Sequence, residues 1–296
     1  MTTIQPQRLI VTGGRGRLAA LIADHFRAPA YAVRLYSRHG NDGFHPLTEL
    51  TNPTHLNGSD TLLHLAWSTL PATSEQNPDS ERQHDLPFLA RLLQAGAAGK
   101  PHLIFFSSGG TVYGNAPGRP SLETDPRHPI GSYGRAKLAA EELIMQARQQ
   151  GLPCTILRIS NPYGYPVPRG RVQGVIPHAI RCAVEGRPLT LWGDGQARKD
   201  FLYYTDFLSA LEEVITRRLT GTFNLCAGES HSVREIITLV EKYTGRKIAT
   251  TLTPAPPWDV QDSRLDRRRF SEATGWRPQV ALDEGIRRAT VGYLDP

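Results

Sequence analysis

The chain has 296 residues, of which 39% are hydrophobic and 21% are charged, so it is long enough for one large globular domain or two unequal ones. No apolar run approaches the ~20 residues that a membrane span needs, and the first residues lack the features of a signal peptide, so we expect a cytoplasmic protein with no membrane partner. The formal charge of +6 is spread along the chain without an aromatic-interleaved basic patch, which argues against nucleic acid as a partner.

The first half of the chain alternates short apolar runs with helical patterns. Strands are expected at residues 8–12, 32–36, 61–66, 102–107 and 154–159, and helices at 17–26, about 80–98 and 133–149. Strands that are apolar throughout and alternate with helices indicate a parallel sheet that is covered on both faces. The predicted fold class is therefore α/β, with a doubly wound parallel sheet.

The second half has a different texture. Proline and glycine are frequent at 161–174 and 253–258, and helical patterns recur at about 175–186, 206–218 and 232–245. We expect a large domain over residues 1–165 and a smaller C-terminal domain over 166–296, with segments near 198–228 returning to the main sheet.

Glycines at positions 13 and 16 lie in the segment TGGRGRLA, directly after the first expected strand. Glycine lets the backbone turn tightly and approach a pyrophosphate, whose charge is stabilised by the amides and dipole of the following helix. Because Gly13 and Gly16 follow a strand and open a helix, residues 1–165 are predicted to be a Rossmann-type NAD(P)-binding domain.

The end of the second strand usually distinguishes NAD from NADP, because an acidic residue there accepts hydrogen bonds from the ribose 2′-hydroxyl. This chain has Ser37 and Arg38 at that place. A hydroxyl and a guanidinium suit a 2′-phosphate better than a bare hydroxyl, so the cofactor is expected to be NAD or NADP with a preference for NADP.

The three cysteines are an odd number and widely spaced. Cys154, Cys182 and Cys226 form no CxxC pair and have no neighbouring histidines at metal-site spacing. We expect buried free thiols and no metal site.

Tyr133 and Lys137 stand four residues apart in GSYGRAK, so on a helix their side chains share one face. The unperturbed pKa of tyrosine is about 10, which leaves too little phenolate at neutral pH for a base. A nearby ammonium or an oxidised nicotinamide ring would stabilise the phenolate. The pair is a candidate acid/base site.

Ordered motifs along nearly the whole chain resemble the extended short-chain dehydrogenase/reductase family, and within it the nucleotide-sugar epimerases and dehydratases. The motifs are TGGRGRLA at 12–19, HLA at 64–66, SSGGTVYG at 107–114, SYGRAK at 132–137, RISNPYG at 158–164 and LWGDGQARKDFLYYTDF at 191–207. The resemblance implies that residues 166–296 are mainly a substrate-binding domain.

The resemblance also implies roles for particular residues. Tyr133 would be the acid/base, and Lys137 would bind the nicotinamide ribose and lower the pKa of the tyrosine. The residues expected to contact the cofactor are Gly13, Gly16, Arg17, Leu18, Ser37, Arg38, Leu65, Ala66, Ser107, Tyr133 and Lys137. The residues expected to contact a UDP- or dTDP-linked sugar are Asn161, Val175, Ile176, Lys199 and Arg264.

One departure from the family pattern concerns the sugar hydroxyl. Relatives usually carry Ser or Thr where this chain has Gly109, so Thr111 or Ser108 would have to supply that hydroxyl as a catalytic group. The dehydratase branch carries an acidic pair directly after its threonine, and this chain has Gly110 and Thr111 there, which argues against a dehydratase.

Three functions are consistent with these patterns. The first is an NAD(P)-dependent nucleotide-sugar 4-epimerase that oxidises C4 transiently and returns the hydride. The second is an NADPH-dependent reductase of a nucleotide-linked 4-keto sugar, and the third is a nucleotide-sensing module without chemistry. Apolar positions on the helices at about 80–98 and 133–149 favour a homodimer through a family-like helix bundle.

Overall fold

The computed structural model describes residues 6–58, 60–116, 118–165 and 173–294. The chain forms two compact units. Unit 1 consists of Met1–Ser108, Gly131–Arg158 and Glu212–Phe223, and unit 2 consists of Gly109–Ile130, Ile159–Leu211 and Asn224–Pro296. The predicted domains divide the chain differently, because the loop 109–130 belongs to unit 2, and their boundary borders residues 166–172, which lie outside the described residues.

A seven-stranded sheet forms the centre of unit 1, in the order β10-β6-β5-β4-β1-β2-β3. Its strands are β1 Gln7–Thr12, β2 Tyr31–Ser37, β3 His45–Pro46, β4 Thr61–His64, β5 His102–Ser108, β6 Cys154–Ile159 and β10 Gly221–Leu225. The pairings β1–β2, β1–β4, β2–β3 and β4–β5 are all parallel. The predicted α/β fold with a doubly wound parallel sheet is confirmed.

The strand order reverses next to β1. The chain passes from β1 to β2 and β3 on one side, and then returns to place β4 on the other side of β1. In open α/β sheets, ligands bind at the carboxyl ends of the strands where the order reverses. The turn after β1 and the segment after β4 therefore define the expected binding edge of unit 1.

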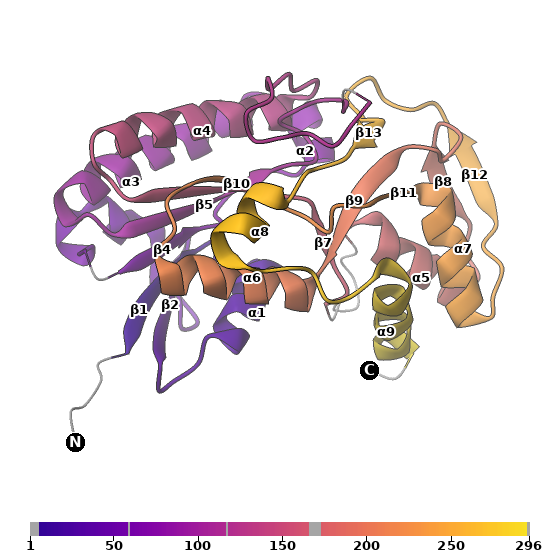
Figure 1. Ribbon diagram of the computed structural model, residues 1–296, viewed down its shortest axis with the longest axis horizontal. Coiled ribbons are helices and arrows are strands. Elements are labelled where there is room, and N and C mark those ends of the chain that lie inside the picture. The colour runs from indigo at the N-terminus through magenta and orange to yellow at the C-terminus, as the bar shows by residue number, and fades with distance from the viewer. Residues whose placement is uncertain (1–5, 59, 117, 166–172, 295–296) are drawn as a thin grey trace. The chain divides into compact units, whose positions relative to one another are not determined.

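Helices cover both faces of this sheet. Figure 1 shows α3 and α4 side by side over one face and α1 over the other. The helical segments that lie wholly within unit 1 are α1 Arg17–His25, η1 Leu47–Thr51, η2 Pro53–His55, α2 Pro71–Gln76, η3 Glu81–Asp85, α3 Leu86–Gly99 and α4 Ser132–Gln149. A core of fully buried side chains, among them Ile10, Leu62, Phe105 and Ile144, fills the space between sheet and helices.

The predicted helix at 80–98 is two segments rather than one. The first turn, η3, is π-helical, and regular α-helix begins only at Leu86. Pro87 lies in the first turn of α3, where its missing N–H is not needed by the helix. Such π-helical turns occur frequently at functional sites.

Unit 2 contains two small sheets. Strand β9 Arg198–Tyr203 is the centre of the larger one and pairs with β7 Asn161–Tyr163, β11 Ser230–Ser232 and β13 Asp262–Ser263. Strands β8 Leu189–Trp192 and β12 Thr250–Thr253 form the other. The helices are α5 Val175–Glu185, α7 Val233–Thr244, α8 Arg268–Thr274 and α9 Leu282–Leu294, and α6 Tyr204–Arg217 runs from unit 2 into unit 1.

The core of unit 2 packs α5, α7 and α9 together through Ile176, Ile180, Ile236, Val240 and Ile286. All three cysteines are buried free thiols, as predicted. None of the helices in the described part of the chain is both long and apolar enough to cross a bilayer.

Candidate active site

The turn after β1 approaches the end of β4 closely. Gly13 adopts φ +71°, a conformation that side chains other than glycine rarely take, and a Cβ there would lie 2.9 Å from the Ala66 amide nitrogen. The Gly16 amide donates to the Gly13 carbonyl over 2.7 Å, and a Cβ on Gly16 would lie 3.0 Å from that same oxygen. Glycine is therefore required at position 13, whereas a side chain at position 16 would need the Gly13 carbonyl to shift by a few tenths of an ångström.

The N-terminus of α1 follows this turn directly. Gly16 is the N-cap residue, and no side chain caps the helix. The first amides of a helix lack partners within the helix and carry the positive end of its dipole, so they form an anion-binding site. Arg17 and Leu18 are half-buried in this first turn, and the Arg17 Nη1 atom is buried with no partner among the described residues.

Thr12 ties the glycine turn to β4. Its Oγ1 accepts hydrogen bonds from the amides of Leu65 and Ala66 over 3.1 and 3.0 Å, and lies 2.9 Å from Nδ1 of His64. With both amides donating to the oxygen, the Thr12 hydroxyl donates its own proton to Nδ1, so His64 carries its proton on Nε2. Burial lowers the pKa of His64 to about 3, which keeps the ring neutral.

Ser37 and Arg38 at the end of β2 differ in whether their side chains are free to bind a cofactor phosphate. The Ser37 hydroxyl is buried and donates to the His39 carbonyl, so its proton is already used within the loop. Arg38 is exposed and makes no hydrogen bond or ion pair with the described residues. Arg38 is therefore the group that is free to bind a 2′-phosphate.

Tyr133 and Lys137 lie one turn apart on α4, as the spacing predicts. The Lys137 side chain is buried, and its Nζ donates to the Phe106 carbonyl on β5 over 3.0 Å. Nζ lies 5.6 Å from the centre of the Tyr133 ring. Unit 1 therefore places the phenol and the ammonium beside the carboxyl end of β5.

The pKa values of this pair differ from the sequence-based expectation. Burial raises the pKa of Tyr133 above its usual range, and the nearby carboxylates of Glu81 and Asp85 raise it further. Burial also lowers the pKa of Lys137 to about 7, against the opposing influence of the carboxylates. Burial and the two carboxylates therefore dominate the pKa of Tyr133 in the chain alone, and the lowering expected from Lys137 with an oxidised nicotinamide stays a prediction.

Three residues near this pair carry no motif and were missed by sequence reasoning. Trp67 stacks on the ammonium, with Lys137 Nζ 3.7 Å from the centre of an indole ring, a cation–π contact that favours the charged form. Glu81 is 1% exposed and accepts from the Thr69 hydroxyl, and Asp85 accepts from the Ser68 amide over 3.1 Å. Both acids belong to the π-helical turn η3, which is seen only in the structure, so no sequence pattern pointed to them.

A buried ion pair links α4 to β6. The Arg158 guanidinium donates to both carboxylate oxygens of Glu141 over 3.0 and 2.7 Å, and both side chains are almost fully buried. Ser107 donates its hydroxyl to Glu141 Oε1 over 2.6 Å. The Ser107 side chain therefore points into unit 1, and only its backbone is available to a cofactor.

The two candidates for the missing sugar-orienting hydroxyl belong to different units. Ser108 ends β5 in unit 1, is half-buried, and its hydroxyl has no partner among the described residues. Thr111 lies in unit 2, and its Oγ1 is buried without a partner in the described part of the chain. An unpaired buried hydroxyl is costly in a folded protein, which singles out Thr111.

Three of the predicted substrate residues lie on β7 and at the start of α5. The side-chain amide nitrogen of Asn161 donates to the backbone carbonyl of Asp200 over 2.8 Å. The side-chain oxygen of Asn161 stays available for other contacts. Val175 is half-buried in the first turn of α5. Ile176 is 1% exposed and packs in the core of unit 2, so its side chain serves that core.

The two predicted phosphate-binding cations are already paired. Lys199 Nζ contacts the Asp259 carboxylate over 3.0 Å and also donates to the Val260 carbonyl. Arg264 donates to both carboxylate oxygens of Asp262, over 3.0 and 2.7 Å. Neither cation offers an unengaged charge to a phosphate.

The groups in unit 1 fit a nicotinamide dinucleotide. The glycine turn leaves space that a Cβ would fill, the first amides of α1 are uncapped, and Arg38 is free. Arg17 Nη1, in the first turn of α1, is buried without a partner in the described residues. The residues that would hold the group are Gly13, Gly16, Arg17, Leu65, Ala66, Tyr133 and Lys137.

This fold and this set of groups define a class of protein. The model of the NAD dependent epimerase/dehydratase family matches residues 9–226. The chain belongs to that family, which confirms the resemblance seen in the sequence motifs and makes it an NAD(P)-dependent enzyme of the extended short-chain dehydrogenase/reductase type.

The relatives of the chain include nucleotide-sugar epimerases and a reductase. The chain is 28% identical to a UDP-glucose 4-epimerase of Mycolicibacterium smegmatis, over 94% of this chain and 96% of that protein. It is 30% identical to a dTDP-4-dehydro-6-deoxyglucose reductase of Escherichia coli, over 76% of this chain and 72% of that protein. The solved UDP-glucose 4-epimerase of Thermus thermophilus in complex with NAD is similar with a TM-score of 0.85 at 27% identity, covering 97% of this chain and 99% of that one.

Proposed function

We propose that the chain is an NAD(P)-dependent nucleotide-sugar 4-epimerase acting on a UDP-linked sugar. The observation that carries the proposal is the pair Tyr133 and Lys137, held one turn apart on α4 in the same unit as the glycine turn. A sensing module has no need for a half-buried phenol beside a buried ammonium, because burying a charge is costly unless it is paired or hydrogen-bonded.

Tyr133 is proposed as the acid/base. Its phenolic oxygen would take the proton from the C4 hydroxyl of the sugar and return it to the same oxygen later. A bound oxidised nicotinamide would accept the hydride from C4 of the sugar and would later return it. Since burial raises the pKa of Tyr133, its deprotonation needs the positive charges of Lys137 and of the oxidised ring together.

Lys137 is proposed to hold the nicotinamide ribose and to supply one of those charges. Trp67 and the Phe106 carbonyl fix its Nζ, and the carboxylates of Glu81 and Asp85 favour its protonated form. Thr111 is proposed to orient the sugar hydroxyl in place of the side chain that Gly109 lacks, with Ser108 as the second candidate.

The cofactor proposal is NAD or NADP, with Arg38 binding a 2′-phosphate. Arg38 is free, whereas Ser37 is engaged by its own loop. Loss of one charge-assisted contact to a phosphate costs about 1.5–3 kcal/mol, so Arg38→Ala should weaken NADP binding at least about tenfold and leave NAD binding unchanged. Equal effects on the two cofactors, measured by tryptophan fluorescence titration, would contradict this role.

On the substrate side, unit 2 is proposed to bind the nucleoside diphosphate through Asn161, Val175, Lys199 and Arg264. For Lys199 and Arg264 to contact the diphosphate, their existing ion pairs with Asp259 and Asp262 would have to break. The homodimer and the cytoplasmic location expected from the sequence stay predictions.

The test separates an epimerase from a reductase by what happens to the cofactor. Purified chain is incubated with UDP-glucose and catalytic NAD or NADP, and sugar nucleotides are resolved by mass spectrometry and chromatography while absorbance is followed at 340 nm. The proposal predicts interconversion of two UDP-sugars without net change in absorbance. Stoichiometric NADPH consumption with a nucleotide-linked 4-keto sugar, and no interconversion, would favour the reductase instead.

A further inference from the structure

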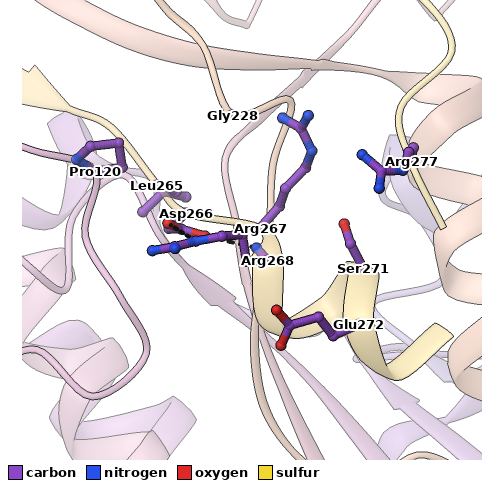
Figure 2. Close-up of a pocket in the computed structure, with 9 residues that line it drawn as sticks. All are labelled: Pro120, Gly228, Leu265, Asp266, Arg267, Arg268, Ser271, Glu272 and Arg277. Carbon is purple, nitrogen blue, oxygen red and sulfur yellow. Dashed lines mark hydrogen bonds and ion pairs between the residues drawn. The ribbon is translucent and has the colours of Figure 1, made fainter. Parts of the chain in front are cut away.

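A cavity of about 560 Å³ opens in unit 2 beside helix α8 (Figure 2). This volume lies in the range of sites that hold small molecules. The wall is formed by residues 265–268, 271, 272 and 277, and by the loops that contain Pro120 and Gly228. None of the residues predicted to bind the nucleotide sugar lines the cavity.

Arg267 supplies a fixed positive charge on this wall. Its Nη1 donates to the Ala227 carbonyl, and a Cβ on Gly228 would lie only 2.0 Å from Nη1, so the loop passes this close because residue 228 is glycine. The loop is itself held by Asp200, which accepts from the amides of Ala227 and Gly228 over 2.9 and 2.8 Å. A guanidinium held in this way loses little conformational entropy on binding an anion.

Two further donors converge on the same space. The Arg277 guanidinium makes no hydrogen bond or ion pair with the described residues, and Figure 2 shows it pointing toward the guanidinium of Arg267. The Ser271 hydroxyl oxygen points between these two groups, and it is buried without a partner among the described residues. Two cations that face each other beside an unsatisfied hydroxyl are stabilised by an oxyanion between them.

The remaining charged residues of the cavity limit what the ligand can be. Arg268 is neutralised by Asp266, whose carboxylate also accepts from the Arg268 amide. Glu272 carries a carboxylate without a partner in the described part of the chain, on the other side of Ser271 in Figure 2. A carboxylate accepts hydrogen bonds from hydroxyl groups and repels a second anion.

We propose that this cavity binds a small phosphorylated polyol, with the phosphate between Arg267, Arg277 and Ser271 and a hydroxyl of the organic part on Glu272. The site is separate from the residues assigned to the nucleotide sugar, so it does not rest on the epimerase activity. It would let the chain respond to a phosphorylated metabolite.

Calorimetric titration with inorganic phosphate and with glucose 1-phosphate, in the presence of saturating UDP to compete for any nucleotide site, tests the proposal. The wild-type chain should bind glucose 1-phosphate saturably and more tightly than inorganic phosphate. Arg277→Gln should weaken both about tenfold, since each loses a charge-assisted hydrogen bond. Ser271→Ala should weaken both less.

The control is Arg287→Gln, which removes the same charge from α9, outside the cavity, at an exposed position that pairs with Glu284. It should bind both probes as the wild type does, and all variants should keep the wild-type unfolding midpoint. Glu272→Gln should remove the preference for glucose 1-phosphate and retain phosphate binding. Absence of saturable binding, or unchanged affinity in Arg277→Gln, would overturn the site, and equal affinity of the wild type for both probes would overturn the role of Glu272.

Discussion

The cofactor side in unit 1 and the predicted phosphate-binding residues in unit 2 are prepared differently for a ligand. In unit 1, the glycine turn and the uncapped start of α1 are already placed, and the exposed Arg38 is not engaged. In unit 2, Lys199 and Arg264 are each neutralised by an aspartate. The difference indicates that a dinucleotide would meet a preorganised site, whereas the proposed contacts of Lys199 and Arg264 with a nucleotide sugar would require existing ion pairs to be exchanged.

Preorganisation in unit 1 has a visible structural cause. The buried Arg158–Glu141 pair and the three-way contact of Thr12 fix the strand ends and α4 on which the functional groups lie. The Lys199–Asp259 pair is 21% and 12% exposed at its two side chains, so solvent screens it and it is easier to break.

The largest expected effect is the loss of turnover in Tyr133→Phe. Removal of a general acid/base costs about 10²–10⁴-fold in rate, and we expect about 10³-fold here. Because the phenol ring remains in place as a phenyl ring, dinucleotide affinity should stay close to that of the wild type. Turnover within tenfold of the wild type, measured on the interconverted UDP-sugar, would remove Tyr133 from the mechanism.

The second effect concerns the stability of unit 1. Arg158→Met leaves the Glu141 carboxylate buried without its guanidinium partner, which should lower the free energy of unfolding by about 3–5 kcal/mol. The double variant Glu141→Gln/Arg158→Met should recover much of that loss, because no charge remains buried. Denaturant unfolding measures both, and the matched change Lys199→Met in the more exposed pair, whose side chains are 21% and 12% exposed, should cost less, about 1 kcal/mol. Equal costs at the two pairs would break the contrast.

The third effect is a pH dependence set by Lys137. Burial lowers its pKa to about 7, so above that pH the folded chain has released a proton that the unfolded chain keeps up to its ordinary pKa of 10.5. Wild-type stability should therefore rise relative to Lys137→Met as the pH increases from 7 to 9, by on the order of 2 kcal/mol. Below pH 7 both states are protonated and the folded wild type bears the full cost of the buried charge, so Lys137→Met should be the more stable chain there.

Chemical denaturation at pH 6, 7, 8 and 9 follows that difference. Asp85→Asn should lower the pKa of Lys137 further, because Asp85 raises it in the wild type. A stability gap between the wild type and Lys137→Met that does not change with pH would show that Lys137 keeps its ordinary pKa in the folded chain.

The smallest effect is expected at the paired cations of unit 2. Asp259→Asn frees Lys199 from its carboxylate, so the affinity for UDP should rise by a few-fold, in keeping with the about 0.2–1 kcal/mol of a partly exposed ion pair. Calorimetry at two salt concentrations measures it, and the gain should shrink at the higher one. A loss of UDP affinity would show that Asp259 positions Lys199 for the ligand.

Local spacing explains which parts of the site could be predicted from the sequence. Gly13 and Gly16 and the pair Tyr133 and Lys137 act within one turn or one helix, so their separation along the chain determines their geometry. The alternation of buried strands and helices predicted the parallel sheet for the same reason, since each element shows its own period. The ends of elements were less certain, as the π-helical start of the helix at 80–98 shows.

The parts that could not be predicted depend on contacts between distant segments. Asp259 lies 60 residues after Lys199 in the chain, and no motif links them. Trp67, Glu81 and Asp85 affect Lys137 only because the sheet brings η3 and the end of β4 beside α4. The burial that raises the pKa of Tyr133 is likewise a property of the packed unit.

The most direct test of the central claim follows the hydrogen at C4. The chain is incubated with UDP-glucose deuterated at C4, or with whichever UDP-sugar it interconverts, together with a catalytic amount of unlabelled cofactor, and the C4 epimer is isolated and examined by NMR. The account predicts that the epimer keeps its deuterium at C4. Replacement of that deuterium by solvent hydrogen, or its accumulation in free reduced cofactor without any epimer, would contradict it.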